Sequence, residues 1–460
     1  MKYNLLKKRL LLVIIVLYAV TTVVSATSDT VLIDKSTENG NMFYVGGDGS
    51  GNYSIIQDAI DDSSDGDTVF VYDDSSPYYE NIMIDKSINL IGENRETTII
   101  DSGEKLSVIL IIADRVSISG FTIQNSGILW INHGIDIHSS FNTISNNIIK
   151  NNHIGIGQYT SGGYSANNNI ISNNVIEEND GNGVYLYESF NNVISMNTIS
   201  DNDGGLIIRF SNYNNVSNNI FINDGVGIYG LYQNTFSKNI INSKPLVYLE
   251  GESDRVIDED AGQIILVNCN KITVQNQELS DVSVGLMLVN SHNCLISGNT
   301  INLNNMYGIF LTYSNNNNIS KNMVSTNANG ITLDTSDGNV ILLNTIDSNI
   351  VRGIYLYSSN NNTISSNIIK NNGGRRWIEN FEGIKLYFSS YNRIYHNNFL
   401  HNACDAYFSG ECIQNNWDGN YWSRPRFLPK IITGQTGSLF FSWRFNFDWH
   451  PAKEPYDIEV

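Results

Sequence analysis

Short runs in which apolar and polar residues alternate fill most of this chain, and asparagines separate them. The recurring line is Asn, any residue, an apolar residue, two more residues, Asn, any residue, an apolar residue, two more residues and Asn. Seven strict copies begin at Asn142, Asn169, Asn192, Asn317, Asn339, Asn362 and Asn392, and looser copies begin at Asn214, Asn234 and Cys294. A period of two predicts short strands rather than helices, because successive side chains of a strand point to opposite faces.

A second recurring element, Gly-apolar-x-apolar, lies between these lines, as in Gly183-Val184-Tyr185-Leu186. The spacing is 22 residues from Gly183 to Gly205 and again 22 from Gly205 to Gly227. Each period holds three alternations, so it predicts a coil of three short strands. One coil cannot bury its own apolar side chains, but stacked coils can when each strand pairs in parallel with its copy about 4.8 Å away.

The sequence therefore predicts an all-β fold, a parallel β-helix of about a dozen coils. Apolar residues at equivalent positions should stack in one buried column, which would contain Ile144, Ile171, Ile194, Ile319, Ile341 and Ile364. Asparagine at the strand ends tolerates left-handed backbone angles and can bond its amide to the asparagine of the next coil. Glycine at the head of a strand would supply a backbone angle that other residues resist. Nearly every asparagine of the repeat is thus interpreted as structural.

The beginning of the chain differs from the repeat. Residues 1–26 are typical of a signal peptide, with Lys2, Lys7, Lys8 and Arg9 before an uncharged apolar run. Residues 27–87 are predicted to be a leader and an N-terminal cap. Apolar residues at helical spacing in Ser54–Ser63 predict a short amphipathic helix that closes the open end of the stack.

The repeats are predicted to span 88–416, with an irregular break over 242–263 that contains Pro245 and an acidic run. The last segment, 417–460, is rich in tryptophan, including Trp417, Trp422 and Trp449. It is predicted to pack over the last coil as a C-terminal aromatic cap.

The charge balance narrows the class of partner. The chain has 27 basic and 46 acidic residues, and removal of residues 1–26 would leave 23 against 46, a net charge of −23. Nucleic acid is excluded as a partner, because its affinity depends on basic residues that neutralise phosphates. A secreted or cell-surface location is expected, with no membrane span in the mature chain.

The chain has four cysteines and no Cys-x-x-Cys motif. An even number permits disulfides outside the cytoplasm. Cys404 and Cys412 bracket one short segment and are the candidate pair.

Several stretches resemble one known family: the Asn-x-Ile-Ser-x-Asn-x-Ile copies, the segment from Gly49 to Ile60, and Ile88-Asn89-Leu90-Ile91-Gly92. They resemble NosD-like right-handed parallel β-helix proteins, which belong with the pectin-lyase-like superfamily and with carbohydrate-binding and sugar-hydrolase repeat domains. The resemblance covers about residues 43–422, and the segment Asn415–Ser423 resembles the endings of secreted archaeal members. It implies a right-handed fold and says little about activity, since one fold hosts many functions.

A possible ligand-binding strip comes from the outward positions of the Gly-apolar-x-apolar strands. Rings on such a strip offer flat faces to sugars, and charged groups fix hydroxyls, so a polysaccharide or cell-surface glycan is the predicted partner. The alternative is that tyrosine simply favours strands. The candidate residues are Tyr185, Tyr187, Tyr229, Phe310, Tyr355, Tyr357 and Tyr387, with the basic-aromatic cluster Arg375, Arg376 and Trp377 in an insertion.

Three other functions stay open. A polysaccharide lyase or glycoside hydrolase would need catalytic residues, but Asn-Thr-Asp, Gly-His-Gly and Arg-x-Lys signatures are absent from the sequence, so the catalytic residues are unknown. A copper-related role, suggested by the NosD resemblance, would need clustered His, Cys or Met, and His133 and His153 are the only His pair that the repeat places together. No cofactor is predicted, and calcium and copper both stay open. A rigid adhesin or spacer would need the fold alone.

Overall fold

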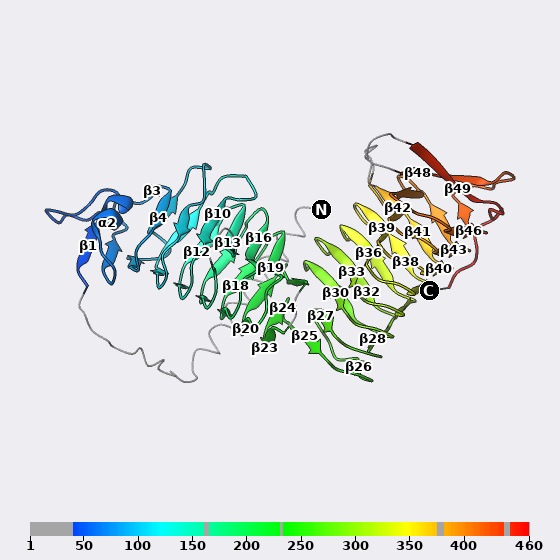
Figure 1. The fold of residues 1–460 in the computed structure, drawn as a ribbon, viewed down its shortest axis with the longest axis horizontal. Helices are drawn as coiled ribbons and strands as arrows, with labels where there is room; N and C mark the ends of the chain where they lie inside the picture. Colours follow the sequence, from blue (N-terminus) through cyan, green and yellow to red (C-terminus); the bar gives the residue numbers. More distant parts are fainter. Residues whose placement is uncertain (1–39, 161–164, 231–232, 375–380, 437–441, 460) are drawn as a thin grey trace, which may run out of the picture. The chain divides into compact units, whose positions relative to one another are not determined.

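The computed structural model describes residues 40–160, 165–230, 233–374, 381–436 and 442–459, so the predicted signal peptide lies outside the described residues. Residues 40–460 form one compact unit. The unit is a right-handed parallel β-helix, whose coils follow one another from blue to red in Figure 1. Two stacks of coils, here called the first block and the second block, join at residues 242–263. In the described part, no helix is long and apolar enough to cross a membrane.

The coils of the first block build three parallel sheets, and each coil from β2 to β22 contributes one strand to every sheet. The first sheet contains β1 (Met42–Val45), β2 (Thr68–Val71), β5 (Asn89–Gly92), β8 (Ser117–Ser119), β11 (Thr143–Ser145), β14 (Ile170–Ser172), β17 (Val193–Ser195), β20 (Asn215–Ser217) and β23 (Thr235–Ser237). The second contains β3 (Tyr78–Tyr79), β6 (Ile99–Asp101), β9 (Thr122–Gln124), β12 (Ile148–Lys150), β15 (Val175–Glu177), β18 (Thr198–Ser200), β21 (Ile220–Ile222) and β24 (Ile240–Ile241). The third contains β4 (Ile82–Ile84), β7 (Ile109–Ile111), β10 (His133–Ile137), β13 (Ile154–Tyr159), β16 (Asn182–Tyr187), β19 (Gly204–Arg209) and β22 (Val226–Tyr229).

The second block repeats this arrangement. Its first sheet contains β26 (Val256–Ile257), β28 (Thr273–Gln275), β31 (Leu295–Ser297), β34 (Asn318–Ser320), β37 (Val340–Leu342), β40 (Thr363–Ser365), β43 (Arg393–Tyr395) and β46 (Asn416–Asp418). Its second contains β29 (Glu278–Ser280), β32 (Thr300–Asn302), β35 (Met323–Ser325), β38 (Thr345–Asp347), β41 (Ile368–Lys370), β44 (Asn398–Leu400) and β47 (Tyr421–Trp422). Its third contains β25 (Lys244–Glu250), β27 (Gln263–Val267), β30 (Val284–Val289), β33 (Tyr307–Thr312), β36 (Asn329–Asp334), β39 (Arg352–Tyr357), β42 (Glu382–Tyr387) and β45 (Ala406–Ser409).

The first sheets hold nine and eight strands, so the described residues form seventeen coils rather than about a dozen. The additional coils pair in the same way but do not carry the asparagine line. The stack already starts at β1, which pairs with β2 in parallel, and β2 pairs with β5.

Two buried columns replace the predicted single column of isoleucines. Ile144, Ile171 and Ile194 are adjacent in the first block, and Ile319, Ile341 and Ile364 are adjacent in the second. All six are fully buried. The columns are separate because β24 turns back antiparallel against β25 at the break, and β25 then starts a new stack by pairing in parallel with β27.

Side-chain hydrogen bonds join the end of the first block to the start of the second. Gln263 Nε2 donates to the carbonyls of Val226 (2.6 Å) and Val284 (2.8 Å), and its Oε1 accepts from Val226 N (2.8 Å). Ser283 Oγ accepts from the backbone N–H groups of Gly205 and Gly225, each at 3.2 Å. The backbone groups left open at the end of one stack are thus satisfied by residues of the next.

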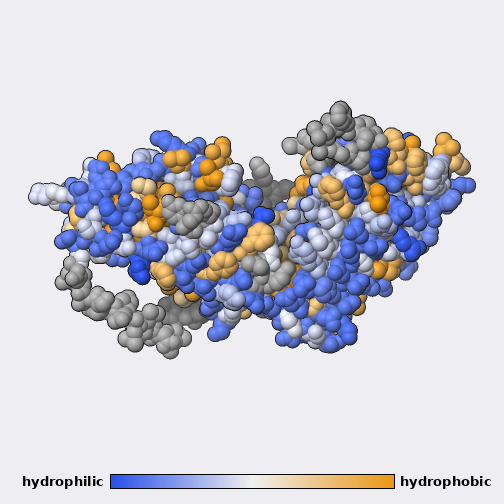
Figure 2. Space-filling model, viewed as in Figure 1, coloured by the Kyte–Doolittle hydropathy of each residue, from blue (hydrophilic) through white to orange (hydrophobic). Residues whose placement is uncertain are grey.

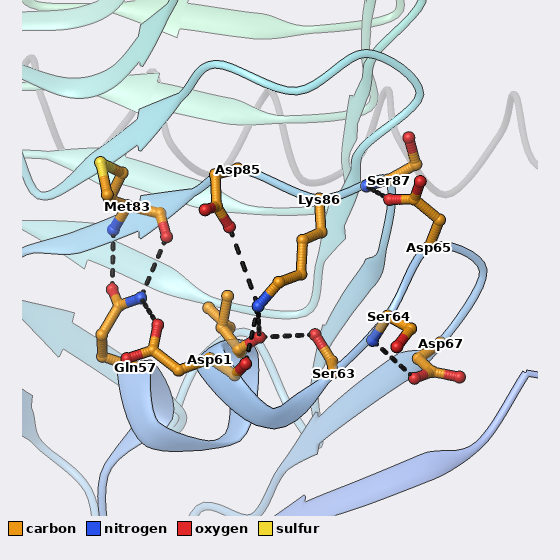
Figure 3. Close-up of polar contacts among 11 residues, drawn as sticks. Gln57, Asp61, Ser63, Ser64, Asp65, Asp67, Met83, Asp85, Lys86 and Ser87 are labelled. Atoms are coloured by element: carbon orange, nitrogen blue, oxygen red, sulfur yellow. Dashed lines mark hydrogen bonds and ion pairs between the residues drawn. The ribbon is translucent and has the colours of Figure 1, made fainter.

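The predicted cap helix is α2 (Ile56–Asp62), which buries Ile56, Ala59 and Ile60 against the first coils. Figure 3 shows how polar contacts attach it: Gln57 exchanges two hydrogen bonds with the backbone of Met83, at 2.8 and 3.1 Å. Lys86 Nζ donates to the carbonyls of Ile60 and Asp61 at the C-terminal end of the helix. A cation at that end stabilises the helix, since its last carbonyls lack intrahelical partners.

At the other end, the antiparallel hairpin β48 (Lys430–Thr436) and β49 (Ser442–Asp448) adds to the last coil. Trp417 and Trp422 are buried, and Trp422 Nε1 donates to Asp448 Oδ2 at 3.0 Å. Trp449 is 60% exposed.

One position in the inward column of the third sheet of the first block is polar. Gln158 stands between Ile137 and Leu186 in the inward column of the third sheet. It is fully buried, and neither its Oε1 nor its Nε2 has a hydrogen-bond partner in the described structure. A buried unpaired amide costs roughly 1–3 kcal/mol.

Gln158→Leu is therefore expected to raise the free energy of unfolding by about 2 kcal/mol, as measured by denaturant titration. An unchanged or lower free energy of unfolding would show that the amide of Gln158 has hydrogen-bond partners.

Candidate functional site

The outer face of the third sheet in the first block carries two columns of side chains above β10, β13, β16 and β19. The first column, at the middle of the strands, contains Asp136, Gly157, Tyr185 and Ile207, as the pairing register shows. The column at the strand ends contains Tyr159, Tyr187 and Arg209, with His138 following directly after β10. Parallel pairing in register thus brings residues from four coils onto one surface.

A cavity of about 740 Å³ opens on this face. Its walls are mostly aromatic and aliphatic, and three of its polar residues, His133, Asp136 and His138, come from β10 and the residue that follows it. The lining includes Trp130, Ile131, His133, Asp136, His138, His153, Tyr159, Tyr185, Tyr187 and Arg209.

The carboxylate of Asp136 is the centre of the polar part. Its Oδ1 lies 3.2 Å from His133 Nδ1 and 3.0 Å from His138 Nε2. The contact to His133 is bent away from good hydrogen-bond geometry, so its attraction is mainly electrostatic. Burial acts to raise the pKa of Asp136, but the two imidazoles outweigh burial and lower it. The carboxylate is therefore ionised at neutral pH.

The two histidines differ in burial. His133 is 2% exposed, whereas the side chain of His138 is 23% exposed at the cavity wall. The hydrogen bond to Asp136 raises the pKa of His138, and this effect exceeds the opposing effect of burial. His138 thus gains a proton more readily than an ordinary histidine.

Tyr159 extends this arrangement to the next coil. Its hydroxyl lies 3.2 Å from His133 Nε2, and its ring stacks on that of His133 with centroids 5.2 Å apart. Burial raises the pKa of Tyr159 well above its usual range, so the phenol stays neutral. Gly157 provides the space, since a Cβ there would lie 2.7 Å from the Tyr159 ring and 3.0 Å from His133 Nδ1. Asp136, His133 and Tyr159 consequently form one contiguous row.

Tyrosine rings continue the wall from Tyr159. The ring centroids of Tyr185 and Tyr187 lie 5.5 and 6.4 Å from that of Tyr159. Both rings are half-buried, so part of each faces the cavity. These two residues are the predicted strip residues that the structure brings together in a pocket.

Tyr229 and Phe310 occupy outward positions of their strands, as predicted, but neighbouring residues cover them, so they do not form part of an exposed strip. Their ring centroids lie 5.8 Å apart where the two blocks meet, and Phe310 also stacks on Tyr307 at 4.6 Å. Phe310 is 4% exposed. The break at 242–263 explains the difference, because it brings the second stack against β22 and covers an otherwise outward position.

The remaining strip residues lie in the second block. The Tyr357 ring stacks on the Tyr387 ring with centroids 5.2 Å apart, and it meets the Tyr355 ring edge-on with centroids 6.3 Å apart. The Arg352 guanidinium lies 4.5 Å from the centroid of the Tyr355 ring. Arg375, Arg376 and Trp377 lie outside the described residues.

The predicted disulfide between Cys404 and Cys412 is wrong, since both thiols are free. The strand β45 lies between the two cysteines, and a strand of four residues spans more than 10 Å. Cys404 Sγ contacts the carbonyl of Ala406, and Cys412 Sγ contacts that of Ser409.

The family model of NosD, described as a periplasmic copper-binding protein, matches residues 60–254 and 247–426. The chain belongs to the NosD family. No curated protein matches it in sequence. Two solved structures with similarity to this NosD-family chain are an A-module of a mannuronan C-5 epimerase from Azotobacter vinelandii and an alginate lyase from Paenibacillus. The epimerase module is 14% identical, with a TM-score of 0.28, over 81% of this chain and 95% of that one. The lyase is 14% identical, with a TM-score of 0.35, over 64% of this chain and 97% of that one.

The family description implies copper, but the residues of this NosD-family chain do not fit a copper centre. All seven histidines and all four cysteines lie in the described ranges, and no group of three or more His, Cys, Asp or Glu there is arranged to hold a metal ion. Both ring nitrogens of His133 already face Asp136 and Tyr159. Strand pairing places Ile154, rather than His153, beside His133. Copper requires clustered soft or imidazole ligands, which this arrangement does not offer.

Proposed function

We propose that this protein binds a saccharide, as part of a polysaccharide or cell-surface glycan, in the cavity above β10–β19. The observation that supports it is the juxtaposition of stacked tyrosine rings with the ionised Asp136 carboxylate and two histidines in one cavity. Sugar rings present apolar C–H faces and polar edges, and such a cavity offers a partner for each. An extracytoplasmic location belongs to the same proposal, and it is supported by the basic and apolar leader and by the family description.

Each residue has a distinct part in this proposal. Tyr185 and Tyr187 stack on the sugar faces, and the exposed edge of His138 donates to hydroxyl or acidic groups of the ligand. Arg209, at the far end of the column, offers a planar set of donors. Asp136 is nearly buried and acts mainly through the imidazoles that it holds.

A second candidate function, acid–base chemistry on the bound saccharide, is favoured by the row Asp136–His133–Tyr159. An ionised carboxylate beside Nδ1 favours the tautomer of His133 with its proton on Nδ1 and a free lone pair on Nε2. That lone pair can accept the Tyr159 hydroxyl proton across 3.2 Å. A group so positioned could move a proton to or from a sugar, as glycan-cleaving enzymes require.

A glycan array and a reducing-sugar assay on the purified chain test both candidates. We expect the parent to bind at least one glycan, and Tyr185→Ala/Tyr187→Ala to weaken that binding by about tenfold or more, equivalent to at least ~1.4 kcal/mol. The matched control is Tyr313→Ala/Tyr391→Ala, which removes two tyrosines exposed by 51% and 48% on the second block.

The row at Asp136 is tested separately. Tyr159→Phe should retain binding and lose any release of reducing ends if Tyr159 transfers a proton. Tyr355→Ala/Tyr357→Ala measures whether the second strip, which includes Tyr387, extends the proposed contact along a polymer. If the parent binds no glycan, or if Tyr185→Ala/Tyr187→Ala binds as the parent does, the cavity is not the site and the scaffold role is favoured.

A further inference from the structure

The loop that enters β10 is longer than the equivalent loops of the next three coils, and it is rich in exposed apolar residues. Residues 125–132 connect β9 to β10 with eight residues, whereas the equivalent connections in the next three coils have three, four and three residues (151–153, 178–181 and 201–203). The additional residues are Ile128, Leu129, Trp130 and Ile131, and they are 77%, 57%, 72% and 49% exposed. Four adjacent large apolar residues held in water are a sign of an interaction surface.

Backbone hydrogen bonds and close packing at Gly127 hold the base of this loop. The backbone therefore keeps the apolar tip of the loop exposed. Gly127 N donates to the carbonyl of Leu106 at 2.9 Å, and Asn132 N donates to that of Leu129 at 2.8 Å. A Cβ at Gly127 would lie 2.3 Å from Asn132 Nδ2 and 2.6 Å from the carbonyl of Lys105, so only glycine fits there. Leu106, on the preceding coil, is 60% exposed and adds to the apolar surface.

The loop is continuous with the cavity of the proposed saccharide site. Trp130 and Ile131 are part of the cavity wall, whereas Ile128 and Leu129 are outside it. The polar end of the cavity at Asp136 and His138 is thus continuous with the apolar surface of the loop. Figure 2 shows that apolar residues on the mostly hydrophilic visible face gather in separate patches, some of them at the upper edge of the first block.

We propose that the ligand of this site is a saccharide attached to a hydrocarbon chain, a glycolipid presented by a bilayer. The headgroup enters the cavity, and the loop Ile128–Ile131 enters the bilayer interface beside it. This inference rests on the proposed saccharide binding. A soluble glycan would use the tyrosines and the polar end but would leave Ile128 and Leu129 in water.

Charge and side-chain type agree with this occupant. Residues 125–132 contain no charged side chain, so the loop can leave water without neutralising a charge. Tryptophan is enriched at membrane interfaces because its ring is amphipathic. The net charge of the chain is −19, which opposes approach to an anionic bilayer. The headgroup and the loop, rather than electrostatic attraction, must therefore provide the affinity.

Flotation of the full chain with lipid vesicles tests the proposal. The probes are phosphatidylcholine vesicles alone, the same vesicles with galactosyl-diacylglycerol, and the same vesicles with glucuronosyl-diacylglycerol. The parent should float with at least one glycolipid vesicle and not with phosphatidylcholine alone. Ile128→Ser/Leu129→Ser should reduce flotation at least tenfold and leave the affinity for soluble oligosaccharides unchanged, since neither residue lines the cavity. The matched control is Phe427→Ser/Leu428→Ser, which alters residues 85% and 77% exposed near the C-terminal hairpin.

Three results would overturn this inference while the proposed saccharide binding stands. The parent could bind soluble oligosaccharides but float with neither glycolipid vesicle. Alternatively, the loop variant could float like the parent, or the parent could float with vesicles of phosphatidylcholine alone. A loop variant that changes the molar mass in light scattering would assign the loop to contacts between copies of the chain, and would overturn it too. A parent that binds neither soluble nor lipid-linked saccharides would remove both proposals.

Discussion

Ile341→Asp is expected to destabilise the second block by roughly 5 kcal/mol or more, because it removes a packed apolar side chain and buries a carboxylate without a partner. Ile341 is fully buried, with 0% of its surface exposed to water. It pairs with Ile319 on one side and with Ile364 on the other. Coils of a solenoid contact mainly their neighbours, so the defect should open the stack locally. Thermal melting and limited proteolysis, with cleavage mapped by mass spectrometry, measure this.

Two control variants separate the buried charge from lesser changes at the same coil. Ile341→Val should cost only about 0.5–1.5 kcal/mol. Asn344→Ala should cost roughly 2–3 kcal/mol, since Asn344 Oδ1 accepts from Asn322 N at 2.9 Å and Nδ2 donates to the carbonyl of Ile319 at 2.8 Å. Equal melting temperatures for Ile341→Asp and Asn344→Ala would contradict the inward position of Ile341.

The repeat carried enough information to predict the strands, the buried apolar columns and the asparagine ladder. The ladder is present as predicted: Asn344 Nδ2 donates to Asn367 Oδ1 at 3.0 Å, and Asn322 Nδ2 donates to Asn344 Oδ1 at the same distance. Period-two patterns specify these features directly, because one face of every strand must be buried. The cap helix followed from helical spacing in the same way.

The physical roles assigned to two residue types were wrong. Left-handed backbone angles fall on the residue before the buried asparagine, such as Asn146, Asn173 and Met196, rather than on the asparagine itself. Gly183 heads its strand because the next coil approaches closely, since a Cβ there would lie 2.9 Å from the carbonyl of Gly205. Sequence spacing shows that such positions are special, but the cause depends on contacts between coils.

The pocket could be predicted only in part. Tyr185 and Tyr187 follow from the alternation of a single strand, whereas the contact of Tyr159 with His133 joins residues 26 positions apart. The available signal was the polar set His133, Asp136 and His138 in a strand type that is otherwise apolar. Gly157, where Tyr185 stands one coil later, gave the second signal. The covering of Tyr229 by Phe310 had no local signal, because it depends on how the break joins two stacks.

Asp224→Asn is expected to stabilise the protein by about 4 kcal/mol at pH 7 and by little at pH 4. Asp224 ends the buried ladder of Asn152, Asn179 and Asn202, and its Oδ2 accepts from Asn202 N at 3.1 Å and from Asn202 Nδ2 at 2.7 Å. It is fully buried, and its Oδ1 has no partner in the described structure. Burial raises its pKa to about 8, against the lowering effect of the Asn202 hydrogen bonds.

The sign of the pH dependence follows from that shift. An unfolded aspartate loses its proton near its ordinary pKa of 3.8, whereas the folded chain retains the proton up to about pH 8. Between these values the folded state binds more protons than the unfolded state, so stability falls as pH rises through this window and stays low above it. Asparagine keeps the acceptor for Asn202 and cannot ionise, so this part of the pH dependence should disappear.

Denaturant titrations from pH 4 to pH 9 measure the free energy of unfolding of the parent and of Asp224→Asn. The control is Asp281→Asn, which changes an exposed residue. Parallel pH profiles for the parent and Asp224→Asn would show that Asp224 is ionised in the folded protein, with a partner for its second oxygen.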